Sequence, residues 1–194
     1  SKIEKYSQNI DDAKAWLQEG ETAFMELNSI VVRAYELATD GANGTKTADD
    51  RAQIAKEIEQ LKEQLITAGN TNFAGRYIFG GYNTTVEPFK AYDSNGDGIM
   101  DSLKYNGEDL VGLADAANSD KLKEFQSAKI KYEIGYGIKM DISTPGCDLL
   151  GTGENNLYGV LNKLSNSLKA SDYGEIQDCI GLLQDQHQEV LSQV

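Results

Sequence analysis

The sequence is short of cysteine, histidine and proline. Its 194 residues include two cysteines, one histidine and two prolines. One histidine cannot build a histidine-based metal or catalytic site alone, and Cys147 and Cys179 lack the spacing of paired metal ligands. A disulfide between these cysteines stays open as an alternative for an oxidising setting. Two unpaired thiols are the simpler interpretation.

Positive charge and long apolar runs are also scarce. Lys and Arg total 18 against 31 for Asp and Glu, so the net charge is −13. Nucleic acids and anionic membranes both need clustered positive charge, so this balance argues against either as a partner. No apolar run reaches the roughly 18 residues that a bilayer-spanning helix needs. The start has neither an initiator Met nor a signal-peptide pattern, and we expect a trimmed piece of a longer protein.

A strong helical period is present instead at the N-terminus. Over residues 3–38 apolar or small residues recur at alternating steps of three and four, a heptad seam that predicts one long helix. A second apolar row beside the seam predicts more than one packing neighbour, as in a bundle. The seam comprises Ile3, Tyr6, Ile10, Ala13, Leu17, Gly20, Phe24, Leu27, Val31, Ala34 and Ala38, and the second row comprises Trp16, Ala23, Ile30 and Leu37.

The following segment predicts a second helix that folds back on the first. Residues 40–44 have the composition of a turn, and Thr47 with Asp50 resembles a helix N-cap arrangement. The short turn favours an antiparallel return. The heptad positions of this helix are Ile54, Ile58, Leu61, Leu65 and Ala68.

The helical period stops within residues 70–89. Gly75 can adopt the positive φ that ends helices, and residues 77–79 form a strongly β-favouring run. Pro88 forces the residue before it out of the helical region. We interpret this segment as a joint between a helical rod and a β-rich lobe.

Residues 77 to about 150 predict a small antiparallel β lobe, because alternating apolar and polar residues are separated by Gly and Asp. One short helix is expected within residues 114–125. The expected strands cover residues 77–79, 89–92, 103–105, 130–134 and 138–142.

The helical period returns after Asn156 and predicts two more helices, separated by Ser171 and Asp172, which can cap the second of them. His187 falls in the seam of the last helix, where a packed or boundary position is expected. Because the first and last helices begin and end within a heptad, we expect both to extend beyond this sequence. The apolar positions are Leu157, Val160, Leu161, Leu164 and Leu168, then Ile176, Ile180, Leu183, His187, Val190 and Val194.

The whole pattern predicts an α+β fold. Residues 1–84 and 151–194 together would form an elongated antiparallel bundle of long helices, a coiled-coil-like rod. Residues 85–150 would form an inserted small antiparallel β domain. Two distant parts of the chain therefore share one rod.

One motif has the spacing of a calcium loop. Oxygen-bearing residues at every second position can converge on one hard cation, and Gly98 permits the sharp turn between them. The twelfth position is Lys104 rather than Glu, and no helices flank the loop, so this is not an EF-hand. A hairpin turn that binds nothing is the alternative. The candidate ligands are the side chains of Asp93, Asn95, Asp97 and Asp101 and the carbonyl of Ile99.

The joint also carries a family resemblance. Residues 72–85, Asn-Phe-Ala-Gly-Arg-Tyr-Ile-Phe-Gly-Gly-Tyr-Asn-Thr-Thr, followed by Pro88-Phe89, resemble the helix-to-sheet segment of the flagellar hook-associated protein 3 family. These proteins join hook and filament and belong to the flagellin superfamily. Residues 164–176 also resemble the returning helices of that family. The resemblance is generic over the first helix and weak within the β lobe.

The resemblance implies a structural protein, not an enzyme, secreted by the flagellar type III system into the extracellular flagellum. Its partners would be copies of itself in a ring, hook-associated protein 1, flagellin and an export chaperone. The family requires no cofactor, so calcium would be an addition. This chain would be a central fragment without the terminal helices, and therefore monomeric.

Two other interpretations remain open. Flagellin itself is the nearest, although the Gly-Arg-Tyr-Ile-Phe-Gly-Gly run of residues 75–81 favours the junction protein. A calcium-binding surface adhesion module on a helical stalk is the other, and calcium binding coupled to ligand binding would favour it. An enzyme would need a cleft with convergent titratable groups, and no Ser/His/Asp, Cys/His or paired-carboxylate pattern stands out.

Overall fold

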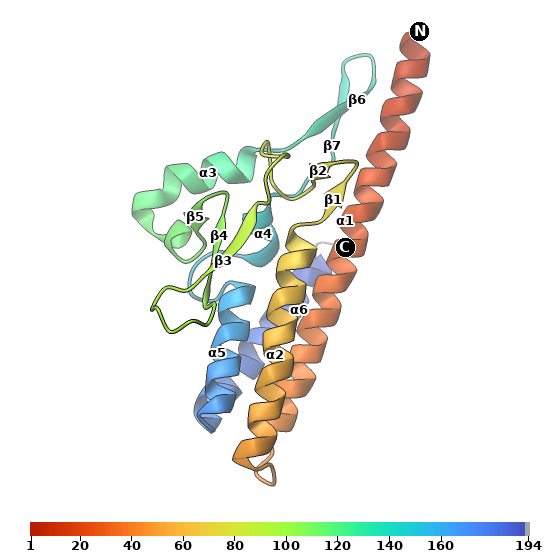
Figure 1. Ribbon diagram of the computed structural model, residues 1–194. Coiled ribbons are helices and arrows are strands. Elements are labelled where there is room, and N and C mark those ends of the chain that lie inside the picture. The colour runs from red at the N-terminus through yellow and green to blue at the C-terminus, as the bar shows by residue number, and fades with distance from the viewer. Residues whose placement is uncertain (193–194) are drawn as a thin grey trace.

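The computed structural model describes residues 1–192 and shows a long helical rod with a lobe attached to one side (Figure 1). Val194, the last position of the predicted C-terminal seam, lies outside the described residues. Four helices build the rod. They are α1 (Lys2–Gly41), α2 (Ala48–Gly69), α5 (Leu157–Lys169) and α6 (Tyr173–Ser192).

The four helices form an antiparallel bundle. Helix α1 packs against α2 and α6, and α5 packs against the same two neighbours from the opposite corner. The first helix of the chain thus lies beside the last one, and the predicted rod shared by two distant parts of the chain is confirmed. In the described part of the chain, no helix is long and apolar enough to cross a membrane.

The turn between α1 and α2 has the predicted cap. The Asp50 amide donates to Thr47 Oγ1 at 3.1 Å, and the Thr47 amide donates back to Asp50 Oδ2 at 2.9 Å. This reciprocal pair satisfies two amides that would otherwise lack partners at the start of a helix. The bond that the Asp50 carboxylate accepts from the Thr47 amide lowers the pKa of Asp50 below its usual value.

The N-terminal half of the predicted α1 seam is confirmed only in part. Ala13 is buried, but Ile3 is 80% exposed and Leu17 is 39% exposed. Trp16 and Ala23 of the second row are buried. The cause is length: α1 has 40 residues, and its neighbours α2 and α6 have 22 and 20. At a rise of about 1.5 Å per residue, α1 outruns both neighbours, so its first turns have no helix facing the seam.

The joint also differs from its prediction. Helix α2 ends at Gly69, and Gly75 instead forms the turn of a small hairpin with Ala74. The hairpin strands are β1 (Asn72–Phe73) and β2 (Arg76–Tyr77). The positive φ of Gly75 was predicted correctly, but it serves a hairpin turn rather than a helix end. The predicted strand at 77–79 stops at Tyr77, and the next two residues enter the core.

The lobe contains several small units rather than one sheet. Strands β3 (Phe89–Tyr92), β4 (Ser102–Tyr105) and β5 (Glu108–Asp109) form one antiparallel sheet. Strands β6 (Lys131–Gly135) and β7 (Ile138–Asp141) form a separate ribbon. The strand predicted at residues 89–92 is confirmed with its bounds, and three others are confirmed within a residue or two.

Short helical pieces complete the lobe. The helix expected within 114–125 is α3 (Ser119–Ser127), preceded by two 3-10 turns, Gly112–Ala114 and Ala116–Asn118. Strand β5 and helix α4 (Gly146–Leu150) were not predicted, because two and five residues are too few to show a period.

One tyrosine connects the lobe to the joint. The Tyr105 hydroxyl donates to the Phe79 carbonyl at 2.7 Å and accepts from the Gly146 amide at 3.1 Å. Its ring packs against Phe89 with 5.1 Å between centroids. A Cβ on Gly146 would lie 2.5 Å from the Tyr105 ring, so only glycine allows this approach. Burial raises the pKa of Tyr105.

Candidate assembly surface

The N-terminal part of α1 projects beyond the other helices and is accompanied by the β6–β7 ribbon (Figure 1). Asn9 Nδ2 donates to the Glu133 carbonyl at 2.7 Å, which ties the helix to the ribbon. The Arg76 guanidinium lies 5.1 Å from the centre of the Trp16 ring and donates to the Tyr132 hydroxyl at 3.4 Å. The β6–β7 ribbon and the joint at residues 70–89 therefore cover Trp16. A neighbouring helix covers the other residues of the second apolar row of α1.

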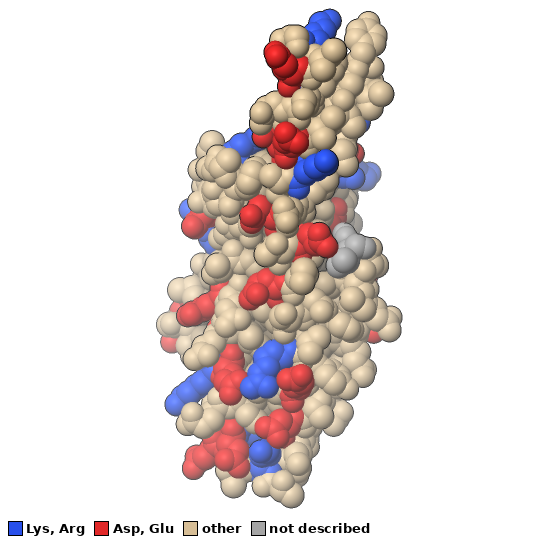
Figure 2. Space-filling model, turned by 90° about the vertical axis from the view of Figure 1, so that its right-hand side faces the viewer, with Lys and Arg blue, Asp and Glu red and all other residues tan. Residues whose placement is uncertain are grey.

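This projecting end exposes large apolar side chains. Ile3 and Tyr136 are 80% and 86% exposed, and Ile138 is 59% exposed. The view from the α1 side shows a narrow end and a mostly uncharged face, on which acidic residues outnumber basic ones (Figure 2). Apolar side chains gathered at one end mark an interaction surface more often than singly scattered ones do.

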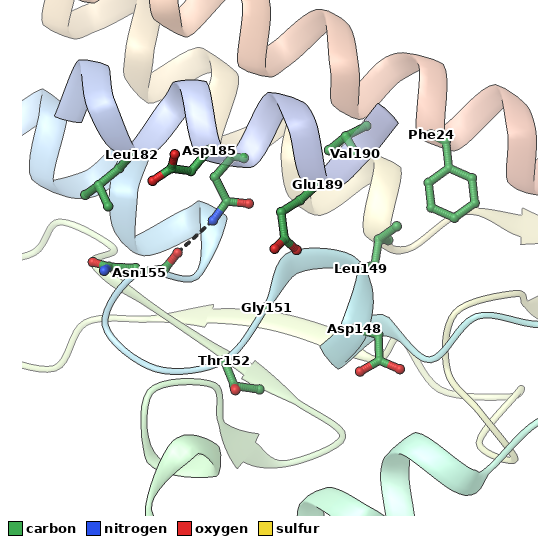
Figure 3. Close-up of a pocket in the computed structure, with 11 residues that line it drawn as sticks. Phe24, Asp148, Leu149, Gly151, Thr152, Asn155, Leu182, Asp185, Glu189 and Val190 are labelled. Carbon is green, nitrogen blue, oxygen red and sulfur yellow. Dashed lines mark hydrogen bonds between the residues drawn. The ribbon is translucent and has the colours of Figure 1, made fainter. Parts of the chain in front are cut away.

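A shallow pocket of 240 Å³ lies between α6 and the loop after α4 (Figure 3). Three of its lining residues, Asp148, Asp185 and Glu189, are acidic, and none is basic. Gln186 Nε2 closes one side by donating to the Asn155 carbonyl at 2.9 Å. The lining contains no histidine, cysteine or serine.

The residues of the predicted calcium loop lie together in an exposed turn between β3 and β4. Asp93 accepts from the amides of Asn95, Gly96 and Gly98, the last at 2.7 Å. These bonds lower the pKa of Asp93. The loop therefore folds around the Asp93 carboxylate.

The other candidate ligands serve the same turn. Asn95 Oδ1 accepts from the Asp97 amide at 3.1 Å, and Asp97 Oδ1 accepts from the Ile99 amide at 2.8 Å. Asp101 accepts from Ser94 and Ser102. Among the described residues, no group of three or more His, Cys, Asp or Glu side chains could hold a metal ion. Oxygens engaged with amides also fit the hairpin-turn alternative, and calcium stays a prediction.

The cysteines and the histidine serve packing. Cys147 in α4 and Cys179 in α6 are buried and unpaired, in line with the simpler interpretation of the sequence. Burial raises the pKa of the Cys147 thiol to about 12 and that of Cys179 to about 11, so both are poor nucleophiles. His187 is half-buried at the contact of α6 with α1, as expected for a boundary position.

Comparison with known proteins connects this architecture to the flagellum. Residues 1–84 match the family described as the bacterial flagellin N-terminal helical region. Flagellar hook-associated protein 3 of Escherichia coli K12 is 31% identical over 103 residues, which cover 53% of this chain and 32% of that protein. Flagellin E of Vibrio cholerae is 27% identical over 134 residues, covering 66% of this chain and 35% of that protein. The matches thus span about a third of these relatives' length.

Solved structures share the fold over nearly the whole chain. A flagellar hook-associated protein structure from Vibrio parahaemolyticus has a TM-score of 0.76 and covers 98% of this chain and 76% of its own, at 18% identity. FlgL of Bacillus cereus has a TM-score of 0.71 with 98% and 80% covered, also at 18% identity. At this identity, the similarity to both structures is a similarity of fold.

A rod of long antiparallel helices from two distant parts of one chain, with a lobe inserted between them, is the fold that this chain shares with these solved structures. Residues 1–84 are similar to the flagellin N-terminal helical region, and part of the chain is similar in sequence to flagellar hook-associated protein 3.

Proposed function

We propose that this chain is the rod-and-lobe part of a structural protein at the hook–filament junction of an extracellular bacterial flagellum. In this role it acts as a mechanical adaptor between hook-associated protein 1 and the flagellin filament. It is not an enzyme. Copies of the full protein form a ring, and an export chaperone delivers it to the flagellar type III system.

The observation that carries this proposal is the shared rod. Helix α6 lies along α1, and Gln184 Nε2 reaches the Tyr35 hydroxyl at 3.5 Å across 149 positions of sequence. A protein that transmits torque needs an elongated body stiffened along its length. A bundle of packed helices supplies that stiffness, because close-packed cores transmit strain.

The surfaces suit assembly rather than chemistry. The projecting end of α1 presents Ile3, and the adjoining ribbon presents Tyr136 and Ile138 to a neighbouring subunit. The shifted pKa values of the described residues belong to buried packing groups, to turn and cap carboxylates, to Tyr92 and to Arg33 in a surface ion pair. This arrangement supports a structural role.

A flagellin subunit of the filament is the second candidate. The match to flagellin E, over 66% of this chain, is the observation in its favour. The Gly-Arg-Tyr-Ile-Phe-Gly-Gly run at residues 75–81, which resembles the junction family, weighs for the first proposal.

Genetic complementation separates the two candidates. The full-length gene is introduced into one strain that lacks hook-associated protein 3 and into another that lacks flagellin. The proposal predicts that the first strain stops leaking flagellin and grows filaments, while the second remains without filaments. Restoration of the flagellin-deficient strain alone would contradict the proposal.

A further inference from the structure

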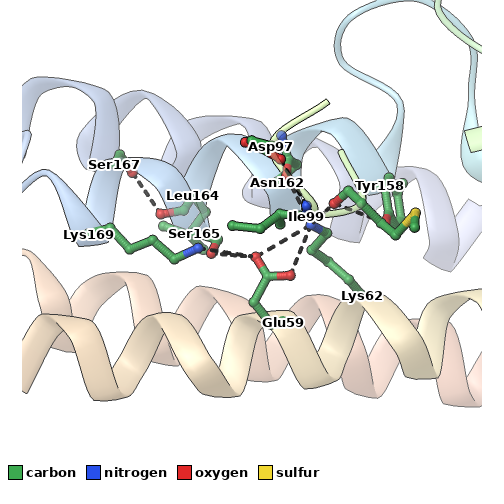
Figure 4. A network of polar contacts seen from close by, with 11 residues as sticks. Glu59, Lys62, Asp97, Ile99, Tyr158, Asn162, Leu164, Ser165, Ser167 and Lys169 are labelled. Atoms are coloured by element: carbon green, nitrogen blue, oxygen red, sulfur yellow. Dashed lines mark hydrogen bonds and ion pairs between the residues drawn. The ribbon is translucent and has the colours of Figure 1, made fainter. Parts of the chain in front are cut away.

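The side chain of Lys62 lies inside the molecule, where an ammonium group is unusual (Figure 4). It projects from α2 and is 2% exposed. Its Nζ donates to the Met100 carbonyl at 2.7 Å, to Asn162 Oδ1 at 2.9 Å and to Glu59 Oε2 at 3.0 Å. Three acceptors thus match the three protons of the ammonium group.

The surroundings form a cage of oxygen atoms around this cation. The Tyr158 ring adds its face, with the Lys62 nitrogen 5.1 Å from the ring centre. Glu59 is itself held by Ser165 Oγ at 2.7 Å and by Lys169 at 3.8 Å. Burial of a charge costs several kcal/mol unless it is paired and hydrogen-bonded, so a complete cage points to a positional role.

The cage joins three parts of the chain. Lys62 and Glu59 belong to α2, and Asn162 belongs to α5. Met100 lies in the exposed acidic loop of the lobe, residues 93–101. In the described part of the chain, the hydrogen bonds from the rod to residues 93–101 come from Lys62 and from Tyr158, whose hydroxyl is 3.5 Å away. Both end on the Met100 carbonyl. The loop's other hydrogen bonds stay within the lobe.

We propose that Lys62 is an internal locking cation: its ammonium group fixes the acidic loop of the lobe to the rod, so that residues 93–101 move with α2 and α5. The side chain supplies the charge that a bound metal ion would supply in an oxygen cage of this kind. The proposal concerns this chain alone and does not depend on the proposed function.

The test compares loop order with rod stability in Lys62→Met. We expect cleavage by a low-specificity protease within residues 93–101 to accelerate at least about tenfold, as loss of a hydrogen bond to a charged group implies. NMR order parameters of the loop amides should fall, while those of α1 and α6 stay unchanged. Lys169→Met is the matched control, because Lys169 contacts the same Glu59 but not Met100. It should leave the loop as in the wild type.

A second variant keeps the test decisive if the first is too unstable. In Glu59→Gln with Lys62→Met both charges are removed, so no buried charge is left unpaired and the melting temperature should recover. The loop should nevertheless remain released. A loop that regains wild-type cleavage in the double variant would overturn the proposal.

Chemical rescue tests the cation directly. In Lys62→Ala, added propylammonium should restore slow cleavage of the loop, and tetramethylammonium, which has no N–H donors, should not. Wild-type loop dynamics in all Lys62 variants would overturn the proposal. An equal loosening of the loop and of all four rod helices would do so as well.

Discussion

The rod and the lobe are stabilised in different ways. In the rod, the heptad positions of four helices supply fully buried side chains, among them Leu27, Leu65, Leu164 and Leu183. In the lobe, strands of two to five residues gather around one aromatic cluster of Phe89, Tyr105 and Phe125. The rod spreads its stabilisation over many similar contacts, and the lobe depends on a few.

This difference predicts different responses to substitution. A charge placed anywhere in the rod core should unfold the whole chain, because every helix shares that core. A change in the lobe should loosen the lobe first, because its polar contacts are local. The lobe core is continuous with the rod core through Phe79, so the two regions are coupled there.

The largest expected effect is in the rod. Leu27→Asp places a carboxylate where the native side chain is 0% exposed, and we expect a loss of more than about 4 kcal/mol in the free energy of unfolding. Leu17→Asp is the control in the same helix. Because Leu17 is 39% exposed, its substitution should cost less than about 1 kcal/mol. Urea unfolding followed by circular dichroism measures both, and equal losses would reject the observed burial pattern.

A smaller effect is expected in the lobe. Tyr105→Phe removes the hydroxyl that donates to the Phe79 carbonyl and accepts from the Gly146 amide. These two groups also bond to each other at 2.9 Å, so neither is left without a partner. The expected loss is about 0.5–1.5 kcal/mol. Tyr136→Phe, at an exposed ribbon position, should change nothing. Thermal unfolding by calorimetry compares the two variants, and an unaffected Tyr105→Phe protein would show that the lobe does not depend on this tyrosine.

Acid should act on one turn in each region. Asp50 in the rod cap and Asp93 in the lobe both have a lowered pKa because they accept amide hydrogen bonds. A carboxyl whose pKa is lowered by folding contributes stability above its ordinary pKa near 3.8, and this contribution is lost as pH falls through the lowered value. NMR shifts of the Gly98 and Thr47 amides, which donate to Asp93 and Asp50, should report the loss below pH 3.8. In Asp93→Asn the Gly98 signal should lose this dependence while the Thr47 signal keeps it.

The smallest effect concerns calcium. If the predicted loop binds the ion, saturating calcium should raise the melting temperature by a few degrees relative to EDTA, through mass action on the folded state. Asp97→Ala should abolish this difference. If the wild-type melting temperature is the same in calcium and in EDTA, the loop is a hairpin turn that binds no calcium.

The rod could be predicted from the sequence because its signal repeats. The four helices, the Thr47 cap and the antiparallel return all follow from local periods and a short turn. The exposed seam at Leu17 was missed, since a period identifies a face but not the length of the neighbouring helix. The apolar row of α2 does not predict a buried Lys62, because a lysine is almost always exposed. The spacing of Lys62 by seven residues from Ala55 and Gly69, both buried, was the available signal.

The lobe could be predicted only in part. Strands with alternating residues, such as β3 and β6, were found, whereas β5 and α4 are too short to carry a period. The contacts of Tyr105 join residues 26 and 41 positions away, and no local pattern encodes them. The candidate calcium ligands lie in one exposed turn, and their spacing does not say whether their oxygens bind amides or a metal ion.

The claim on which this account depends is that α1 and α6 form one rod. Nuclear Overhauser effects between the Tyr35 ring protons and the side chains of Leu183 and Gln184 test it most directly in solution. The account predicts strong cross-peaks between these residues, because Gln184 reaches the Tyr35 hydroxyl at 3.5 Å. Their absence in a folded sample, with the contacts within each helix still present, would contradict it.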